Sequence, residues 1–321
     1  MKRKILALAL TGIMVVSLGA CGGKKTGDGS SKTYKVGVIQ LIEHESLDAA
    51  TKGFKDELKK KFGDRVQIEV KNAQGEAATN ATIANGYVSD GKDLILANGT
   101  ASLQAAMSAT GDIPVLGTAI TDYGTVLNTK NFKGTTGINV SGTSDLAPID
   151  QLEDIMRTIV PKAKKIGIIY CSAEPNSKYQ VKQMEAELQK DGLSYKEYTV
   201  ADANDVQSVA TKACQESDAL YVPTDNVMAA NATVLKNVVV PAKKPLFAGD
   251  KGICSAGVAT LSIDYYKLGQ LTADQAHEIL VNKKDVKSMK IASDTAPKKL
   301  YNAEICKAIG IKIPKGFTPL K

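Results

Sequence analysis

Short apolar segments alternate with segments of helical periodicity along most of this 321-residue chain, and this alternation restricts the possible folds more than any other feature. In the first half the pattern runs YKVGVIQ then SLDAATKGFKDELKKKF, VQIEV then EAATNATIANGYVSD, and DLILA then SLQAAMSAT, followed by IPVLGTA. The strand segments are apolar at consecutive positions, as in parallel strands that are covered on both faces. The sequence therefore predicts βαβ units in a doubly wound parallel sheet.

The same pattern starts again after TTGINV. A helix-like DLAPIDQLEDIMRTIV leads to KKIGIIY, PNSKYQVKQMEAELQKDG, YKEYTV, DANDVQSVATKACQ, DALYVP, NVMAANATVLKNVVV and KPLFAG. A chain of this length has room for about two such units. We therefore expect an α/β protein with two doubly wound lobes.

Polar loops follow the predicted strands in both halves. Ligands of open parallel sheets bind beyond the carboxyl ends of the strands, so these loops are the informative positions. They read LIEHESLD, NGTAS and TAITD in the first half, and CSAEPNS, PTDN, GDKG and IDYYKLG in the second. Seven polar loops at the same end of two sheets predict a binding cleft between the lobes.

The amino terminus has the layout of an export signal. Residues 1–20 combine a basic start with an apolar run from Ile5 to Ser17, which is too short to span a bilayer comfortably. The following Leu-Gly-Ala-Cys resembles a bacterial lipobox, which implies cleavage before Cys21 and a lipid anchor on that residue. Residues 21–33 are then expected to form a flexible tether. A plain secretory signal with an incidental cysteine is the alternative.

Charge and cysteine content exclude several classes of function. The formal net charge is +7, of which the signal holds +3 and residues 22–33 hold +2, so the body is nearly balanced and a nucleic-acid partner is not expected. The four other cysteines form no C-x-x-C pair, which disfavours a zinc site, and we expect buried free thiols rather than disulfides. The motifs G-x-S-x-G and H-E-x-x-H are missing, so we expect neither an enzyme nor a cofactor.

At the strand ends the chain resembles the tryptophan-type ABC-transporter substrate-binding lipoproteins. The resemblance rests on IEHESLD, NAQG, TAITD, AEPNS, VPTDN and IDYYKLG, which span most of the chain after the lipobox. It implies a type I periplasmic-binding-protein fold whose two lobes are joined by three crossovers. It also implies a monomeric receptor, anchored outside the cell membrane, that closes on an amino acid, commonly an aromatic one, and passes it unchanged to a membrane permease with its ATPase.

The resemblance also implies discontinuous lobes. The amino-terminal lobe is expected to comprise residues 34–142 and 264–283, and the carboxy-terminal lobe residues 143–263 and 284–321.

An amino acid needs donors for its carboxylate, acceptors for its ammonium and a wall for its side chain. We place the carboxylate at Thr100, Ala101 and Ser102, where a helix start offers free N–H groups, with help from Thr118; simple N-capping by Thr100 or Ser102 is the alternative.

For the ammonium, Asp225 is the first choice, ahead of Asp250 and Glu174, although Asp225 could instead cap a helix. Asn176 and Ser177 are expected to mix binding and capping roles.

For the wall we expect Leu47, Tyr123 and Tyr265, with core packing as the rival role of each, and we expect His44 to make a polar contact in the cleft. The matching loops add Ser46, Asn226 and Asp264 to the candidate binding residues.

The chain departs from the family pattern near the ligand, at residues 100–103 and at Tyr123, so the identity of the amino acid stays open. A sugar or nucleoside receptor of the same fold and a surface adhesin or sensor lipoprotein are the alternatives.

Overall fold

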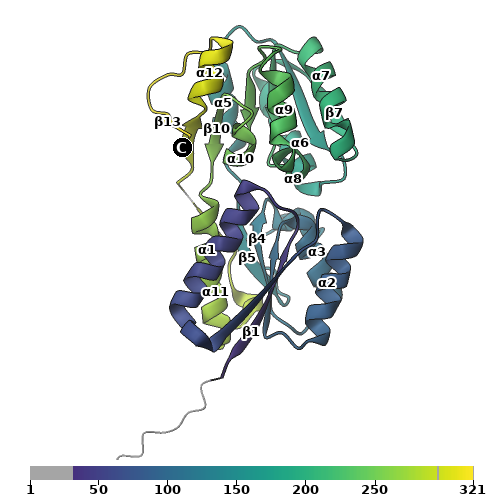
Figure 1. The fold of residues 1–321 in the computed structure, drawn as a ribbon, viewed down its shortest axis with the longest axis vertical. Helices are drawn as coiled ribbons and strands as arrows, with labels where there is room; N and C mark the ends of the chain where they lie inside the picture. Colours follow the sequence, from purple (N-terminus) through teal and green to yellow (C-terminus); the bar gives the residue numbers. More distant parts are fainter. Residues whose placement is uncertain (1–31, 295, 321) are drawn as a thin grey trace, which may run out of the picture. The chain divides into compact units, whose positions relative to one another are not determined.

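Two sheets organise the chain, one in each lobe (Figure 1). The computed structural model describes residues 32–294 and 296–320; the predicted signal peptide, Cys21 and nearly all of the predicted tether lie outside them. Residues from Thr33 on form one compact unit. Within the described residues, every helix is too short or too polar to cross a bilayer.

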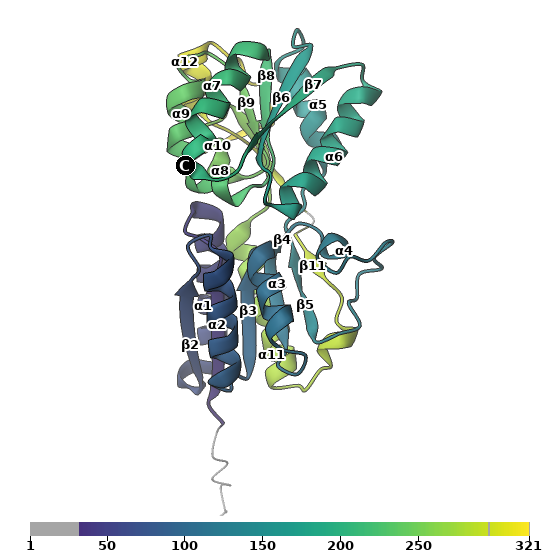
Figure 2. The same cartoon turned by 90° about the vertical axis from the view of Figure 1, so that its right-hand side faces the viewer.

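The first sheet has six parallel strands in the order β11-β5-β4-β3-β1-β2. Their bounds are β1 Tyr34–Gln40, β2 Val66–Asn72, β3 Leu94–Asn98, β4 Val115–Ile120, β5 Val140–Ser144 and β11 Ala292–Ser293. One face is covered by α1 (Glu45–Phe62) and α11 (Tyr265–Leu280), and the other by α2 (Ala77–Ser89), α3 (Thr100–Ala109) and α4 (Tyr123–Val126). Figure 2 shows α2 and α3 on the near side of this sheet and α11 on the far side.

The second sheet has seven strands in the order β13-β12-β10-β9-β8-β6-β7. They are β6 Lys165–Cys171, β7 Ser194–Val200, β8 Ala219–Val222, β9 Leu246–Ala248, β10 Ala259–Ser262, β12 Lys298–Tyr301 and β13 Thr318–Pro319. One face packs on α5 (Ile149–Ile159), α6 (Pro175–Lys190) and α12 (Ala303–Ile309). The other packs on α7 (Val206–Glu216), α8 (Asn226–Ala230), α9 (Ala232–Val239) and α10 (Lys251–Cys254). Both lobes are therefore doubly wound, as predicted.

The chain crosses between the sheets three times, after β5, after β10 and after β11. The lobe boundary predicted at residues 283 and 284 is wrong, because β11 pairs in parallel with β5 through Ala292 and Thr143. Thr143 and Ser144 likewise belong to the first sheet and not to the second lobe. The error has a physical cause: a two-residue strand at a sheet edge buries too little to leave an apolar run in the sequence.

Helix α1 is specified by its own sequence. Leu47, Ala50, Phe54 and Leu58 recur every three or four residues and are all buried, so one stripe faces the sheet. Acidic residues lie in its first turn and three lysines in its last turn, which suits the helix dipole. The helix ends at Gly63, whose φ of 57° is a conformation that favours glycine.

Helices α1 and α11 cross at van der Waals contact between their backbones, side by side in Figure 1. A Cβ atom on Gly53 would lie 2.0 Å from the carbonyl oxygen of Tyr266, and one on Gly269 would lie 2.0 Å from the carbonyl oxygen of Ala50. Only glycine fits at both positions. This crossing fixes the start of α1 relative to the start of α11, and both starts contribute to the candidate site.

All four cysteines within the described residues are buried and free. They are Cys171, Cys214, Cys254 and Cys306. Burial raises the pKa of each thiol, so these side chains act as small apolar groups and are poor nucleophiles.

Candidate functional site

Besides Asp294, which follows β11 and forms an ion pair with Lys267, four carboxylates are buried at the carboxyl ends of the strands: Asp145, Glu174, Asp225 and Asp250. Each of these four is at most 9% exposed, and none of them forms a salt bridge with a lysine or arginine of the described residues. Burial of an unpaired charge is costly. Their hydrogen bonds therefore decide which of them still has capacity for a ligand.

Asp145 follows β5 and is buried among neutral partners. Its carboxylate accepts hydrogen bonds from the hydroxyl of Tyr265 at 2.8 Å and from the hydroxyl of Thr121 at 3.2 Å. Burial, and to a smaller extent the negative charge of Asp250, raise its pKa to about 6. Sequence reasoning missed Asp145 because it was assigned to the following helix, which begins only at Ile149. The strand-end rule, applied to the residue after β5, would have found it.

Asp250 lies where the two lobes meet. Its Oδ1 caps α10 by accepting from the amide of Ile253 at 2.8 Å, and its Oδ2 accepts from the hydroxyl of Ser46 of the first lobe at 3.0 Å. Burial raises its pKa, although the nearby His44 acts in the opposite direction. Asp145 and Asp250 act electrostatically on each other, and we call them the carboxylate pair.

Asp225, our first choice for the ammonium, is occupied instead by groups of its own lobe. It caps α8 through the amide of Met228 at 2.9 Å and accepts from the amide of Cys171 and the hydroxyl of Ser177, each at 2.7 Å. The capping alternative weighed for this residue is therefore the one that the structure shows. Burial raises its pKa.

Glu174 is saturated in the same way. It accepts from the amides of Asn226 and Val227 at 3.0–3.1 Å and from the side chains of Asn176 and Asn226 at 2.8 and 2.7 Å. Burial and the charge of Asp225 raise its pKa. Glu174, Asn176, Ser177 and Asp225 thus form one network that shapes the floor of the second lobe.

The start of α3 has no side-chain cap. Its N-cap is Gly99, which has no side chain to bond the first-turn N–H groups, so capping by Thr100 or Ser102 is not observed. The hydroxyl of Ser102 instead donates to Asn80 at 2.7 Å. Ala101 packs in an apolar cluster with Leu47 and Tyr265, so this helix start lies beside the partner of Asp145. The proposed carboxylate position at residues 100–102 stays a prediction.

Three of the predicted binding residues have other roles in the structure: Thr118, Tyr123 and Asp264. The Thr118 hydroxyl accepts a hydrogen bond from the hydroxyl of Thr143, which in turn contacts Thr272 of α11. Thr118 is therefore buried on the face of the sheet that α11 covers. Tyr123 is not a cleft wall: its ring is 2% exposed, its hydroxyl donates to the carbonyl oxygen of Gly117 at 3.1 Å, and a Cβ on Gly117 would collide with it.

Asp264 caps α11 through the amide of Lys267 and lies 3.6 Å from the amine of Lys298, away from the buried carboxylates. Its neighbour Tyr265 is the residue that contacts the carboxylate pair.

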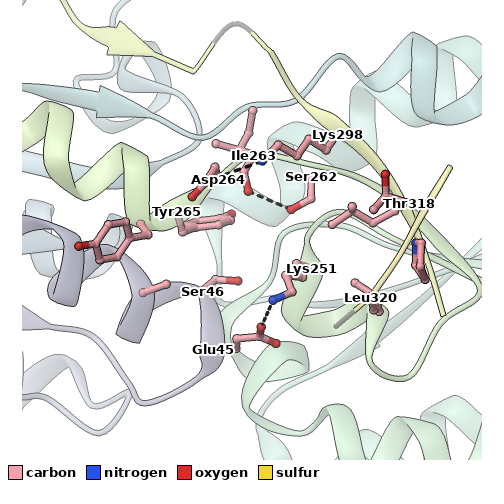
Figure 3. Close-up of a pocket in the computed structure, with 14 residues that line it drawn as sticks. Glu45, Ser46, Lys251, Ser262, Ile263, Asp264, Tyr265, Lys298, Thr318 and Leu320 are labelled. Carbon is pink, nitrogen blue, oxygen red and sulfur yellow. Dashed lines mark hydrogen bonds and ion pairs between the residues drawn. The ribbon is translucent and has the colours of Figure 1, made fainter. Parts of the chain in front are cut away.

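A cavity of about 460 Å³ lies beside the hinge (Figure 3). Ser46 and Tyr265 form the part of its wall shared with the carboxylate pair, and Ile263, Leu300 and Leu320 give it an apolar lining. Its charged groups are already paired, Glu45 with Lys251 at 2.6 Å and Asp264 with Lys298. The carboxylate pair, in contrast, has no lysine or arginine partner in the described chain and is the better candidate site.

Direct contacts join the lobes through the start of α1. The ring of His44 donates from Nε2 to the side-chain oxygen of Asn226 at 3.2 Å, next to the bond between Ser46 and Asp250 and the ion pair between Glu45 and Lys251. The other ring nitrogen of His44, Nδ1, is buried and has no partner in the described part of the chain. The predicted polar role of His44 between the lobes is consistent with these contacts.

The chain is similar to proteins of a known family. The family model described as "ABC transporter substrate binding protein" matches residues 35–318. The chain belongs to this family. A member named tyrosine-binding protein, from Clostridioides difficile, is 38% identical over 88% of this chain and 85% of its own length.

Two solved structures show the same fold. An ABC domain from Streptococcus pneumonia in complex with L-Trp is 31% identical, covers 88% of this chain and 97% of its own, and has a TM-score of 0.84. A ligand-free, open substrate binding protein with adhesive properties from Clostridium difficile is 35% identical, covers 90% and 99%, and has a TM-score of 0.69. This chain thus superposes better on the L-Trp complex than on the open structure, although its identity to the latter is higher. Sugar-binding proteins at 14–16% identity share the fold alone.

Proposed function

We propose that this protein binds an α-amino acid between its lobes and presents it to an ABC importer. The observation that carries the proposal is the carboxylate pair, which is buried at the junction of the lobes without a lysine or arginine partner in the described residues. A ligand ammonium would supply the missing positive charge and form charge-assisted hydrogen bonds. The uncapped helix start at Thr100 would receive the carboxylate of the same ligand.

We further propose that the ligand has an aromatic side chain. The apolar cluster of Leu47, Ala101 and Tyr265 adjoins Asp145 and offers a flat surface beside the ammonium position. The tyrosine-binding relative and the relative solved with L-Trp support the same class.

Closure of the lobes would provide the affinity. A micromolar receptor needs about −8 kcal/mol, which is roughly −0.7 kcal/mol for each non-hydrogen atom of an amino acid of about a dozen such atoms. Such efficiency requires a site that excludes water. The contacts between the start of α1 and the second lobe are of the kind that closes such a site.

The remaining parts of the proposal concern location and partners. We propose that the chain is exported, is lipid-anchored at Cys21, acts outside the cell membrane as a monomer, and delivers its ligand unchanged to a permease. The export signal and lipobox in residues 1–21 support the anchor, and membership of the family supports the transport role.

A binding screen tests the proposal. The chain from Gly22 on is heated with each of the twenty amino acids, common nucleosides and common sugars; a ligand at 100 times its Kd should stabilise it by about 2.7 kcal/mol. We expect aromatic amino acids to give the largest shifts, and mass spectrometry of the released ligand to show that it is unchanged.

A matched pair of ligands sharpens the test. The deaminated analogue of the best ligand, 3-(4-hydroxyphenyl)propionate for tyrosine or indole-3-propionate for tryptophan, keeps the ring and the carboxylate and lacks the ammonium. We expect it to bind at least a hundredfold more weakly, because the carboxylate pair would stay buried and unpaired. Equal binding of the two, or a shift with sugars alone, would exclude the proposed site.

A further inference from the structure

The far end of the first lobe, away from the second lobe, concentrates positive charge. Residues 55–65 at the end of α1 carry a net charge of +2 and residues 283–290 after α11 carry +3, whereas the rest of the chain from residue 33 on sums to −3. The two segments lie near each other: the amine of Lys283 is 5.7 Å from the ring of Tyr34, and that ring packs edge-on against Phe62 at 5.4 Å. The two segments thus bring a net charge of +5 to one end of the first lobe, while residues 298–321 of the second lobe hold a further +5.

Most of these basic side chains of the first lobe are exposed and unpaired within the described chain. Lys59, Arg65, Lys284, Lys287 and Lys290 are exposed and form no salt bridge with any described residue. Lys60 and Lys61 share Glu57.

Exposed apolar side chains occur at the same end. Only three large hydrophobic residues of the described chain are exposed: Val281 at 40%, Ile138 at 39% and Val70 at 38%. Val281 ends α11 directly before the lysines of residues 283–290. Ile138 follows Gly137, whose amide donates to the carbonyl oxygen of Lys287 at 3.3 Å. Basic side chains around isolated apolar ones are typical of surfaces that contact a lipid interface.

The described chain begins at this same end. Tyr34, the first residue of β1, stacks edge-on against Phe62 at 5.4 Å and lies under the amine of Lys283 at 5.7 Å. Figure 1 shows the start of β1 and the ends of α1 and α11 together. Twelve residues separate Cys21 from Tyr34, so a lipid on Cys21 would keep this end within about 40 Å of the bilayer.

We propose that this surface, formed by the exposed basic side chains of residues 59–65 and 283–290 with Val281 and Ile138, rests on the anionic phospholipid headgroups of the membrane. The proposal builds on the lipid anchor proposed above, but the attraction itself requires no acyl chain. The anchor would hold the receptor at the membrane, and the basic surface would orient the undocked first lobe on it. Each basic residue at an anionic surface contributes about a fivefold gain in binding.

Vesicle binding of the unacylated chain, residues 22–321, tests the proposal. We expect sedimentation with vesicles that contain phosphatidylglycerol, little with pure phosphatidylcholine, and loss of binding as salt rises. Lys283, Lys284, Lys287 and Lys290 changed together to Gln should lower the partition coefficient at least tenfold. The matched control changes four exposed lysines of the second lobe, Lys212, Lys236, Lys243 and Lys307, to Gln and should lower it less than threefold.

The apolar contribution has its own control. Val281→Ser with Ile138→Ser should weaken vesicle binding several-fold, whereas Val70→Ser, equally exposed on β2, should not change it.

Several outcomes would overturn the proposal: no preference for phosphatidylglycerol, equal losses in the two lysine variants, or equally tight binding of soluble polyphosphate, which would indicate a soluble polyanion as the partner. Amino-acid binding measured on each variant reports folding and tests the proposed transport function separately, since vesicle binding does not depend on a ligand.

Discussion

Asp145 and Asp250 show at the scale of single residues how burial prepares a side chain for a ligand. Neither carboxylate has a lysine or arginine partner in the described chain, and burial raises the pKa of both. Asp225 is as deeply buried, but two backbone amides and a serine hydroxyl already bind it. Asp145 and Asp250 can thus be stabilised by the positive charge of a ligand, whereas Asp225 holds together groups of its own lobe.

Asp145→Asn tests this division because it removes the charge and keeps the shape. We expect the affinity for the best amino acid to fall at least tenfold and the ligand-free protein to become more stable, since a buried charge disappears. Calorimetry and urea denaturation measure the two effects. The control Asp225→Asn should instead lower stability by about 1–3 kcal/mol, because the NH2 group that replaces Oδ2 cannot accept the hydrogen bonds from Cys171 and Ser177. Unchanged affinity in Asp145→Asn would show that this carboxylate does not hold the ammonium.

The pKa of Asp145 predicts opposite effects of pH on stability and on binding. Its pKa is about 6 in the folded protein against an ordinary value of 3.8, so the folded state binds the proton more tightly than the unfolded state. The stabilisation is fully present below pH 3.8 and is lost as the pH rises through 6. Ligand-free stability should therefore increase from pH 7 to pH 5, while amino-acid affinity falls as Asp145 loses its charge.

The buried Glu153 and Glu174 also have raised pKa values, so the informative quantity is the difference between the wild type and Asp145→Asn across this range. A difference that does not vary with pH would rule out titration of Asp145.

At the scale of elements, the crossing of α1 and α11 positions the site. Gly53 and Gly269 allow the two backbones to touch, and the starts of the same helices carry Ser46 and Tyr265, which bind Asp250 and Asp145. The spacing of the helices therefore controls the distance between the two parts of the site.

Gly269→Ala should separate the helices or strain them, because its Cβ would lie 2.0 Å from the carbonyl oxygen of Ala50. We expect a loss of at least about 2 kcal/mol of unfolding free energy, by overpacking against backbone that has no rotamer to change, together with weaker ligand binding. Gly86→Ala in α2 is the control: nothing lies within 4 Å of its Cβ, so it should stabilise the protein by about 0.5–1 kcal/mol. Urea denaturation of both variants measures the two changes in unfolding free energy. Equal changes would argue against a close crossing of α1 and α11.

The elements also show what the sequence could predict and why the rest escaped. The long buried strands and the doubly wound lobes followed from consecutive apolar positions, which only a sheet covered on both faces produces. Strand β11 left no such run and was assigned to the wrong lobe.

Within the site, Ser46, Asp250 and Tyr265 were found from their places after strands. Asp145 was hidden because Pro148, which precedes α5, was read as part of that helix. The role of Tyr123 depends on room created by Gly117 and Gly142 on two strands, which no local pattern reveals.

At the scale of the whole molecule, the start of α1 acts as a contact between lobes. The Glu45–Lys251 ion pair spans 2.6 Å from the first lobe to the second (Figure 3). It lies beside the hydrogen bond of Ser46 with Asp250. Both charged groups are 40–50% exposed, so the pair is worth about 0.2–1 kcal/mol. It can favour the closed arrangement without fixing it.

Charge reversal tests this contact. We expect Glu45→Lys to weaken amino-acid binding about two- to fivefold at low salt and Lys251→Glu added to it to restore binding, as a double-mutant cycle measures directly. Glu187→Lys, which disrupts the Lys190–Glu187 pair within α6, should leave affinity unchanged. Additive effects of the two reversals would mean that the pair does not contribute to closure.

The discontinuous first lobe has a consequence for biogenesis. Its sheet is completed by β11 at residues 292–293, and α1 packs on α11, which begins more than two hundred residues later. A chain that leaves the cell amino terminus first must therefore wait for nearly its full length before this half can assemble. For the export proposed above, this topology would delay folding until passage through the narrow export channel is almost finished, and an unfolded chain is what such a channel accepts.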